Sequence, residues 1–221
     1  MKRIYLLALF IAASFSMQSL EAQDTTLYCR IKTISVEEMV GGNRQFLQLI
    51  VNRLIVENKR IGLLSISSYA ADNNNKPENN EFQNSALIYH HLSDGISINS
   101  GVTFTSAEGL KNFVGLQYIY QRKTLLLIYL PGYYFINSHK ISNFALIEYR
   151  PSVNENWSLY SRLQLHYNHN LENGFHFRSY AYSRLGLTYK YFSFGLAHNY
   201  DRYGINKSTK NNLGLFLKLS L

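Results

Sequence analysis

Polar and apolar side chains alternate along most of the chain, in segments of about ten residues. In the segment 157–167 the odd positions are mostly apolar, and Trp157, Leu159, Leu163 and Leu165 are among them. Successive side chains of a β-strand point to opposite faces, so a period of two places the two sets on opposite sides of a sheet. The segment is therefore predicted to be a strand with one lipid-like face and one polar face.

The same alternation predicts strands as far as the C-terminus. The segment 123–136 is apolar on both faces and contains Pro131-Gly132. Proline cannot donate to a β-ladder, so a bulge or a local break is expected there. The predicted strands are 45–56, 60–71, 83–92, 95–105, 112–121, 123–136, 141–150, 157–167, 176–189, 192–199 and 212–221.

Short turns and longer polar loops alternate between these strands. The short turns are 57–59, 93–95, 121–123, 151–156 and 190–191. The longer loops are 72–82, 106–111, 137–140, 169–174 and 202–209. Outer-membrane barrels have short periplasmic turns and long external loops, so the strand 45–56 should run towards the periplasm.

One ascending strand must then precede residue 45. Thr26–Ile34 is expected to supply it, with Val36–Asn43 as its outer loop. The total is about twelve strands, an even number as bacterial barrels require. Ten strands is the alternative, if Thr26–Ile34 and the segment after it lie outside the barrel.

The last strand shows which face meets lipid. Leu213, Leu215, Leu217, Leu219 and Leu221 lie on one side of it. Such a face is favourable against acyl chains, so the fold class is predicted to be an all-β, antiparallel, up-and-down transmembrane barrel. Two aromatic belts are expected, one near the short turns (Tyr118, Tyr120, Tyr149, Trp157, Tyr189, Tyr191 and Phe192) and one near the long loops (Phe104, Phe113, Phe135, Tyr167, Phe175 and Tyr200).

The N-terminus has the form of a secretory signal. Lys2 and Arg3 precede the apolar run 4–15, and Ser19-Leu20-Glu21-Ala22 offers a cleavage site. The run is too short to span a bilayer, so residues 1–22 are predicted to be a cleaved signal peptide and 23–221 the barrel; an uncleaved anchor is the alternative. Cys29 is the one cysteine, so no intrachain disulfide can form.

Composition and charge limit the classes of molecule that the chain is expected to bind. Only 16% of the residues are charged, the mean hydropathy is −0.17 and the formal net charge is +8. No apolar stretch after residue 22 is long enough for a transmembrane helix. The export signal and the scattered basic residues argue against nucleic acid and favour outer-membrane lipids, lipopolysaccharide phosphates or small anionic solutes. A basic protein without a specific partner is the alternative.

The polar faces of the last strands supply the candidate functional residues. A hairpin centred near residue 172 would place His166 opposite Arg178 and Arg162 opposite Tyr182, and a turn at 190–191 would place Tyr180 opposite Asp201. This set is either an electropositive constriction that selects anions or, as we favour, a network that fills a narrow barrel. The predicted lumen-lining residues are Tyr160, Arg162, Gln164, His166, Arg178, Tyr180, Tyr182, Arg184, Asn199 and Asp201.

Signals of catalysis and metal binding are weak. The one His-x-Ser, His91-Leu92-Ser93, precedes Asp94-Gly95, which is better explained as a periplasmic hairpin turn. A catalytic serine needs a general base within hydrogen-bond reach, and the sequence singles out no such pair. His166 and His169 are three apart and so fall on opposite faces of a strand. The sequence therefore predicts no catalytic residue, no metal site and no cofactor.

Two stretches resemble a family of small Gram-negative outer-membrane β-barrels, most of which have no assigned activity. They are Glu148–Pro151 through Asn156–Leu163, and Asn211–Leu217. The ending Gly214–Leu221 resembles the signal by which the barrel-assembly machinery recognises its substrates, although it ends in Leu rather than Phe. The resemblance implies the fold and an outer-membrane location, not a substrate.

The function expected from the sequence is therefore that of a non-enzymatic barrel. It would be a narrow channel for small, anionic solutes or a passive envelope component. The alternatives are a lipid-modifying hydrolase and an accessory subunit of an envelope complex.

Overall fold

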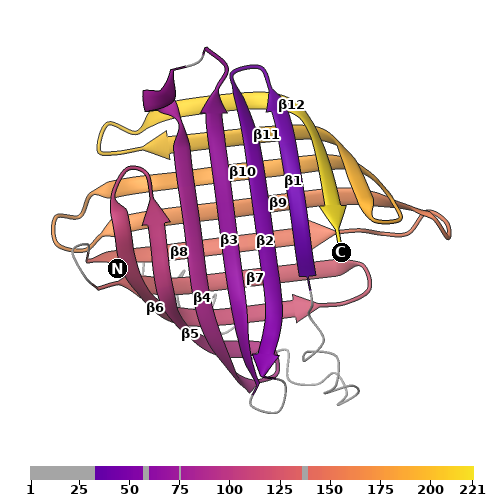
Figure 1. Ribbon diagram of the computed structural model, residues 1–221, viewed down its shortest axis with the longest axis horizontal. Helices are drawn as coiled ribbons and strands as arrows, with labels where there is room; N and C mark the ends of the chain where they lie inside the picture. The colour runs from indigo at the N-terminus through magenta and orange to yellow at the C-terminus, as the bar shows by residue number, and fades with distance from the viewer. Residues whose placement is uncertain (1–32, 57–59, 75, 136–138) are drawn as a thin grey trace, which may run out of the picture.

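The computed structural model describes residues 33–221, apart from 57–59, 75 and 136–138. The described residues form a closed antiparallel barrel of twelve strands, in which each strand pairs with its neighbours in sequence and β1 closes onto β12 (Figure 1). The predicted fold class and strand number are confirmed. The strands are β1 (Thr33–Gly41), β2 (Arg44–Val56), β3 (Ile61–Asp72), β4 (Glu81–Ser93), β5 (Ile96–Thr105), β6 (Gly109–Gln121), β7 (Leu125–Tyr134), β8 (Lys140–Tyr149), β9 (Trp157–Asn170), β10 (His176–Tyr189), β11 (Phe192–Tyr203) and β12 (Ser208–Ser220), with a 3-10 helix, η3 (Pro77–Asn79), in the β3–β4 loop.

The barrel has two walls that cross. Strands β1–β4 run steeply across the front of Figure 1, and β7–β12 run across them behind. This crossing follows from the twist and tilt that strands need in order to close a sheet into a ring. Side chains from the two walls can therefore meet across the interior.

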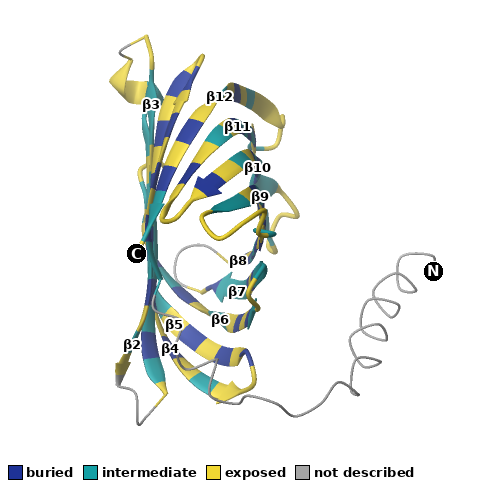
Figure 2. Cartoon of the chain, turned by 90° about the vertical axis from the view of Figure 1, so that its right-hand side faces the viewer, coloured by how far each residue is buried: buried dark blue, intermediate teal, exposed yellow. Residues whose placement is uncertain are grey.

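Alternation along each strand separates an apolar outer surface from a polar interior. Buried and exposed residues form alternating bands along the strands (Figure 2). In β12 Leu213 and Leu215 are 67% and 63% exposed, whereas Asn212 and Lys218 are buried. Exposed leucines in such density belong against hydrocarbon rather than water. Among the described residues, no helix is long and apolar enough to cross a membrane.

Exposed aromatic side chains flank this apolar surface at both ends, with one departure from the prediction. Tyr149 and Tyr191 are exposed at the short-turn end, and Phe135 and Tyr167 at the long-loop end. Phe113, expected in the outer belt, instead points into the barrel and is only 4% exposed. The odd-numbered residues of β6 face inward. The prediction placed Phe113 in the belt without assigning it to a face of its strand.

The first strand extends further towards the C-terminus than predicted. Thr33–Gly41 forms the strand, so most of the segment 36–43 is not an outer loop. Residues 1–32, which include the predicted signal peptide (1–22) and also Cys29, lie outside the described residues. Gly41-Gly42 in this segment suggested a loop. Glu37 is nevertheless stable inside the barrel because two arginines neutralise it.

The strand registers agree with the prediction in one hairpin and differ in the other. Tyr180 lies opposite Asp201, as expected. Between β9 and β10, however, His166 lies opposite Tyr180 rather than opposite Arg178, and Arg162 opposite Arg184. The pairing differs from the prediction by two positions. One arises at the turn, where His176 lies opposite His169, and the other at a β-bulge between His176 and Arg178. A bulge adds one unpaired residue, which sequence alternation alone does not reveal.

Pro131 causes a local break rather than a bulge. The β6–β7 ladder stops after Gly115↔Gly132 and resumes at Tyr118↔Tyr129 in the same register. The β7–β8 ladder continues through Pro131 without interruption. The missing N–H of proline therefore costs pairing on one side only.

Candidate functional site: the barrel interior

The interior has an apolar wall and a polar wall. Inward side chains of β2–β8 form one hydrophobic cluster that includes Ile50, Leu64, Leu130 and Phe144. Most of the buried charges come instead from β8–β12 and β1. Any route for a charged solute must therefore follow the polar wall.

Two carboxylates organise the middle of this wall. Glu37 accepts hydrogen bonds from Arg162 Nη2 at 2.7 Å and from Arg184 Nε at 2.8 Å. All three side chains are at most 3% exposed. A buried carboxylate is stable only when cations and donors surround it, and this site supplies both.

A second group lies beside the first. Glu148 accepts hydrogen bonds from Lys218 Nζ at 2.6 Å and from the Tyr160 hydroxyl at 2.7 Å. Lys218 also donates to the Tyr160 hydroxyl at 3.0 Å. We call the six residues of these two groups the central layer: Glu37, Arg162, Arg184, Glu148, Lys218 and Tyr160.

A third carboxylate gathers cations near the long-loop end. Glu81 lies 3.0 Å from Arg44, 3.3 Å from Arg178 and 2.8 Å from Lys210, and it accepts a hydrogen bond from the Tyr203 hydroxyl at 2.7 Å. One carboxylate cannot neutralise three cations. This cluster therefore leaves positive charge at the outer end of the interior.

Two further carboxylates complete the outer group. Arg178 also pairs with Asp201 at 2.9 Å. Glu108 pairs with both Lys111 and Lys140, whose ammonium groups lie over the ring of Phe177. Cation–π contact adds to the attraction that keeps the two lysines together.

The interior is electropositive overall. Among the described residues, five carboxylates form ion pairs with nine Lys or Arg side chains in the barrel and at its two ends. The carboxylates are Glu37, Glu81, Glu108, Glu148 and Asp201; the cations are Arg44, Lys111, Lys140, Arg150, Arg162, Arg178, Arg184, Lys210 and Lys218.

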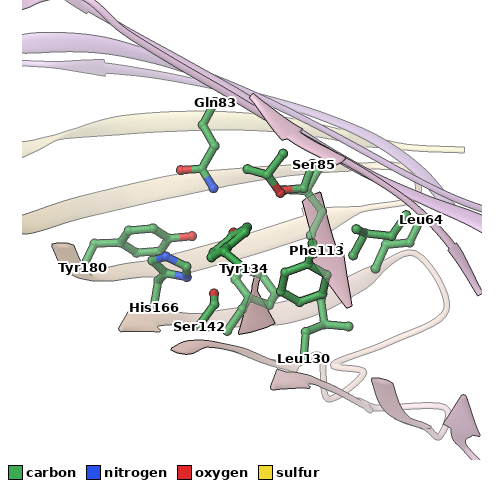
Figure 3. A pocket seen from close by; sticks show the side chains of 13 residues that line it. Leu64, Gln83, Ser85, Phe113, Leu130, Tyr134, Ser142, His166 and Tyr180 are labelled. Atoms are coloured by element: carbon green, nitrogen blue, oxygen red, sulfur yellow. The ribbon is translucent and has the colours of Figure 1, made fainter. Parts of the chain in front are cut away.

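Two cavities lie between the outer end and the central layer. The outer vestibule has a volume of about 160 Å³, and Glu81, Lys111 and Arg178 are among its lining residues. The inner cavity is about 40 Å³, enough for a water molecule. His166 and Tyr180 line it beside apolar residues (Figure 3). Gln83, Thr103 and Tyr134 line both cavities, so the two are adjacent.

Unpartnered polar atoms form a column along β9. Asn168 Oδ1, His166 Nδ1 and Gln164 Oε1 are buried and have no hydrogen-bond partner among the described residues. They are two residues apart, so they share one face at intervals of about 6.6 Å. Asn168 lines the vestibule and His166 the inner cavity. Buried polar atoms need a partner, so water or a solute must satisfy this column.

The ten residues predicted to line the lumen all point into the barrel. Nine are buried, and Arg178 is half-buried at the vestibule. The rings of His166 and Tyr180 stack at 4.9 Å, and those of Tyr180 and Tyr182 at 4.3 Å. The structure brings all ten into contact with the central layer, the vestibule or the aromatic stack between them.

The sequence did not predict the ion-pair and hydrogen-bond partners of these residues. Glu37 lay in the presumed loop, and Glu81 lay just before the predicted start of its strand. Glu148 and Lys218 had a usable signal, because their strand parity puts them on the polar face. The Lys218–Glu148 contact spans 70 positions and the Arg162–Glu37 contact 125, and both depend on closure of the ring.

The His-x-Ser motif at 91–93 gives no support to the hydrolase alternative. His91 Nδ1 lies 2.8 Å from Ser97 Oγ, but Ser97 is fully buried. Ser93 lies at the β4–β5 turn, where Gly95 has φ of 70°. Neither serine is therefore both paired with the base and open to a lipid. No three His, Cys, Asp or Glu side chains of the described chain come together as metal ligands.

No family model and no curated protein matches the chain. Among solved structures, the KdgM porin is similar at 12% identity and a TM-score of 0.47, over 86% of this chain and 99% of that one. The NanC porin is similar at 11% identity and 0.47, over 86% and 99%. LpxR from Salmonella typhimurium is similar at 8% identity and 0.43, over 85% and 99%. At such identities, with TM-scores under 0.5, no property of those proteins is carried over to this chain.

Proposed function

We propose that this chain is a non-enzymatic outer-membrane barrel that gives small anionic solutes a narrow path across the membrane. The observation that carries this proposal is the unpartnered polar column of β9, which joins the outer vestibule to the positively charged central layer. A barrel with no transport role could have filled this space with apolar side chains, as the hydrophobic cluster of β2–β8 fills part of the opposite wall.

The excess of cations sets the preference for anions. An anion entering the vestibule meets Lys111 and Arg178, and beyond the inner cavity it meets Arg162 and Arg184. Rings of charged side chains select permeant ions of the opposite sign. The carboxylates paired with these cations weaken their hold, so a solute that enters can also leave.

The central layer is the constriction. Its side chains are almost fully buried, so a solute passes only when it displaces part of the network. In that step the solute binds beside Glu37, at Arg162 Nε and Arg184 Nη2, which have no hydrogen-bond partner among the described residues. Two cations then face two anions, so every buried charge stays paired.

The vestibule limits solute size. Its volume of about 160 Å³ equals that of roughly five water molecules in the liquid. Inorganic anions and carboxylates of a few carbons fit this space. Larger oligomers do not.

Conductance in planar bilayers tests the proposal. With a salt gradient across the bilayer, the reversal potential should show that anions permeate better than cations. The tight packing of the central layer favours one competing function, a passive barrel that strengthens the envelope. Absence of any conductance step above that of protein-free bilayers would support that function and remove the channel.

The proposal also includes how the chain is exported and inserted into the membrane. Cleavage after Ala22 and recognition of the ending Gly214–Leu221 by the barrel-assembly machinery would bring the chain to a Gram-negative outer membrane. Cell fractionation and N-terminal sequencing check this, with Gln23 expected as the first residue. Recovery of the chain in the inner membrane with residue 1 intact would contradict it.

A further inference from the structure

A hollow on the outside of the barrel lies at its long-loop end. Its volume is about 510 Å³, and it lies between the β9–β10 and β11–β12 loops. Asn168 and Asp201 are buried inside, so their neighbours His169 and Arg202 point outward by strand alternation. The lining residues are Tyr167, His169, Gly174, Phe175, His176, Ser179, Arg202, Ile205 and Lys207.

The hollow is basic and contains no carboxylate. Arg202 and Lys207 are exposed, and within the described chain neither side chain has a hydrogen-bond or ion-pair partner. The nearby acids do not line the hollow: Glu172 lies 3.4 Å from His139, and Asp201 pairs with Arg178 inside the barrel. Two permanent cations are therefore available to a ligand from outside.

The shape of the hollow is fixed by contacts between its two loops. His176 Nδ1 lies 3.2 Å from the carbonyl oxygen of Gly204, and its Nε2 lies 3.0 Å from Ser179 Oγ. The backbone N–H of Gly204 donates to the carbonyl of Phe177 at 2.8 Å. A site held in this way loses little conformational freedom when it binds a ligand.

Apolar surface begins directly below the cations. Leu163, Leu165 and Leu196 face outward on the same strands and are 40% to 59% exposed. Tyr167 and Phe175, each 45% exposed, stand between the two zones. Cations above and hydrocarbon-facing leucines below match a lipid that carries phosphate at its headgroup.

We propose that this hollow binds the phosphorylated sugar headgroup of an outer-leaflet glycolipid, the lipid A part of lipopolysaccharide. Arg202 and Lys207 contact the phosphates, Tyr167 and Phe175 pack against the sugar rings, and the acyl chains lie along the leucines below. The hollow is far larger than one phosphate needs, which favours a glycolipid over a simple anion. The site lies outside the solute path, so it does not depend on the proposed channel.

The test uses the full mature protein in nanodiscs of phosphatidylethanolamine, with purified bisphosphorylated lipid A as the probe in native mass spectrometry. The double variant Arg202→Gln/Lys207→Gln should bind lipid A roughly 30-fold more weakly, because each cation near a membrane surface contributes about fivefold. The matched control is Arg53→Gln/Arg60→Gln, which removes two exposed cations near the opposite end of the barrel. Its affinity should stay that of the wild type.

Heat-modifiable gel migration establishes that each variant is folded. Equal affinity of the wild type and the Arg202→Gln/Lys207→Gln variant would overturn the proposal, as would equal losses in both double variants. A third arm adds inorganic phosphate. Displacement of lipid A by millimolar phosphate would show a site for small anions rather than for a lipid, and would also overturn it.

Discussion

Glu37 holds two arginines that would otherwise repel each other. Arg162 and Arg184 lie opposite one another on neighbouring strands, and both contact the same carboxylate oxygen of Glu37. Like charges directly opposite on a sheet are destabilising unless a counter-charge lies between them. The carboxylate therefore sets both the stability and the charge of the central layer.

Replacing Glu37 with Gln should make the barrel less stable and more selective for anions. Removal of one partner from a buried ion pair costs about 3–5 kcal/mol, because the remaining charges stay buried. The loss should appear as a lower free energy of unfolding in urea. The ratio of anion to cation permeability, from the reversal potential, should rise.

Glu38 provides the matched control for this change. It is the next residue, but it is exposed on the outward face of β1. Glu38→Gln removes the same charge and should shift the unfolding free energy by less than about 0.5 kcal/mol. An identical rise in selectivity in both variants would show that the central layer is not in the conducting path.

Replacing Arg178 with Gln should shift selectivity the opposite way. Arg178 lies between Glu81 and Asp201, at 3.3 Å and 2.9 Å. Without Arg178, Glu81 and Asp201 have fewer cations near them at the vestibule. The reversal potential should therefore shift in the direction that indicates greater cation permeability. Arg53→Gln, an exposed site on the outward face of β2, should leave it unchanged. A wild-type reversal potential for Arg178→Gln would place the path elsewhere.

At the scale of the element, one side chain reinforces the backbone ladder at the seam between β1 and β12. Asn212 of β12 accepts hydrogen bonds from the backbone N–H groups of Asn43 and Arg44 and donates to the carbonyl of Arg44. A side chain at Gly41 would overlap the same amide, so the glycine makes room for it. The β1–β2 turn is thereby tied to the last strand, which completes the ring.

Replacing Asn212 with Ala should weaken this closure. Its amide is only 4% exposed, so the substitution leaves buried backbone groups without partners, at about 1–3 kcal/mol. The temperature at which the folded band converts to the unfolded one in heat-modifiable gel migration should fall. Asn211→Ala, an exposed neighbour whose backbone contact to Asn43 survives, should cause a smaller shift. Equal shifts would contradict a special role for Asn212 at the seam.

The elements also show where sequence reasoning succeeds. Long, strictly alternating strands such as β9 and β12 were predictable because lipid contact demands a uniform apolar face. The position of β1 was not predictable, because a buried Glu37 is stable in a strand only beside Arg162 and Arg184, more than 120 positions away. The β9–β10 register was missed by two positions because neither the exact centre of the turn nor the bulge at His176 has a signature in the alternation.

At the scale of the molecule, charges of two kinds act on a permeating ion. The vestibule charges are partly open to solution, with Arg178 17% and Lys210 41% exposed as side chains. Those of the central layer are almost fully buried, at 0% for Arg184 and 1% for Arg162. Salt screens exposed charges strongly and buried ones weakly, so the two contributions can be separated.

Raising the salt concentration should therefore reduce the anion preference without abolishing it. Between 0.1 M and 1 M the Debye length falls from about 10 Å to about 3 Å, which removes most of the contribution of the vestibule. The selectivity that remains at 1 M belongs to the central layer, and it should be larger in Glu37→Gln than in the wild type. Reversal potentials measured at several mean salt concentrations check this. Complete loss of selectivity at 1 M would show that the buried cations never meet the permeating ion.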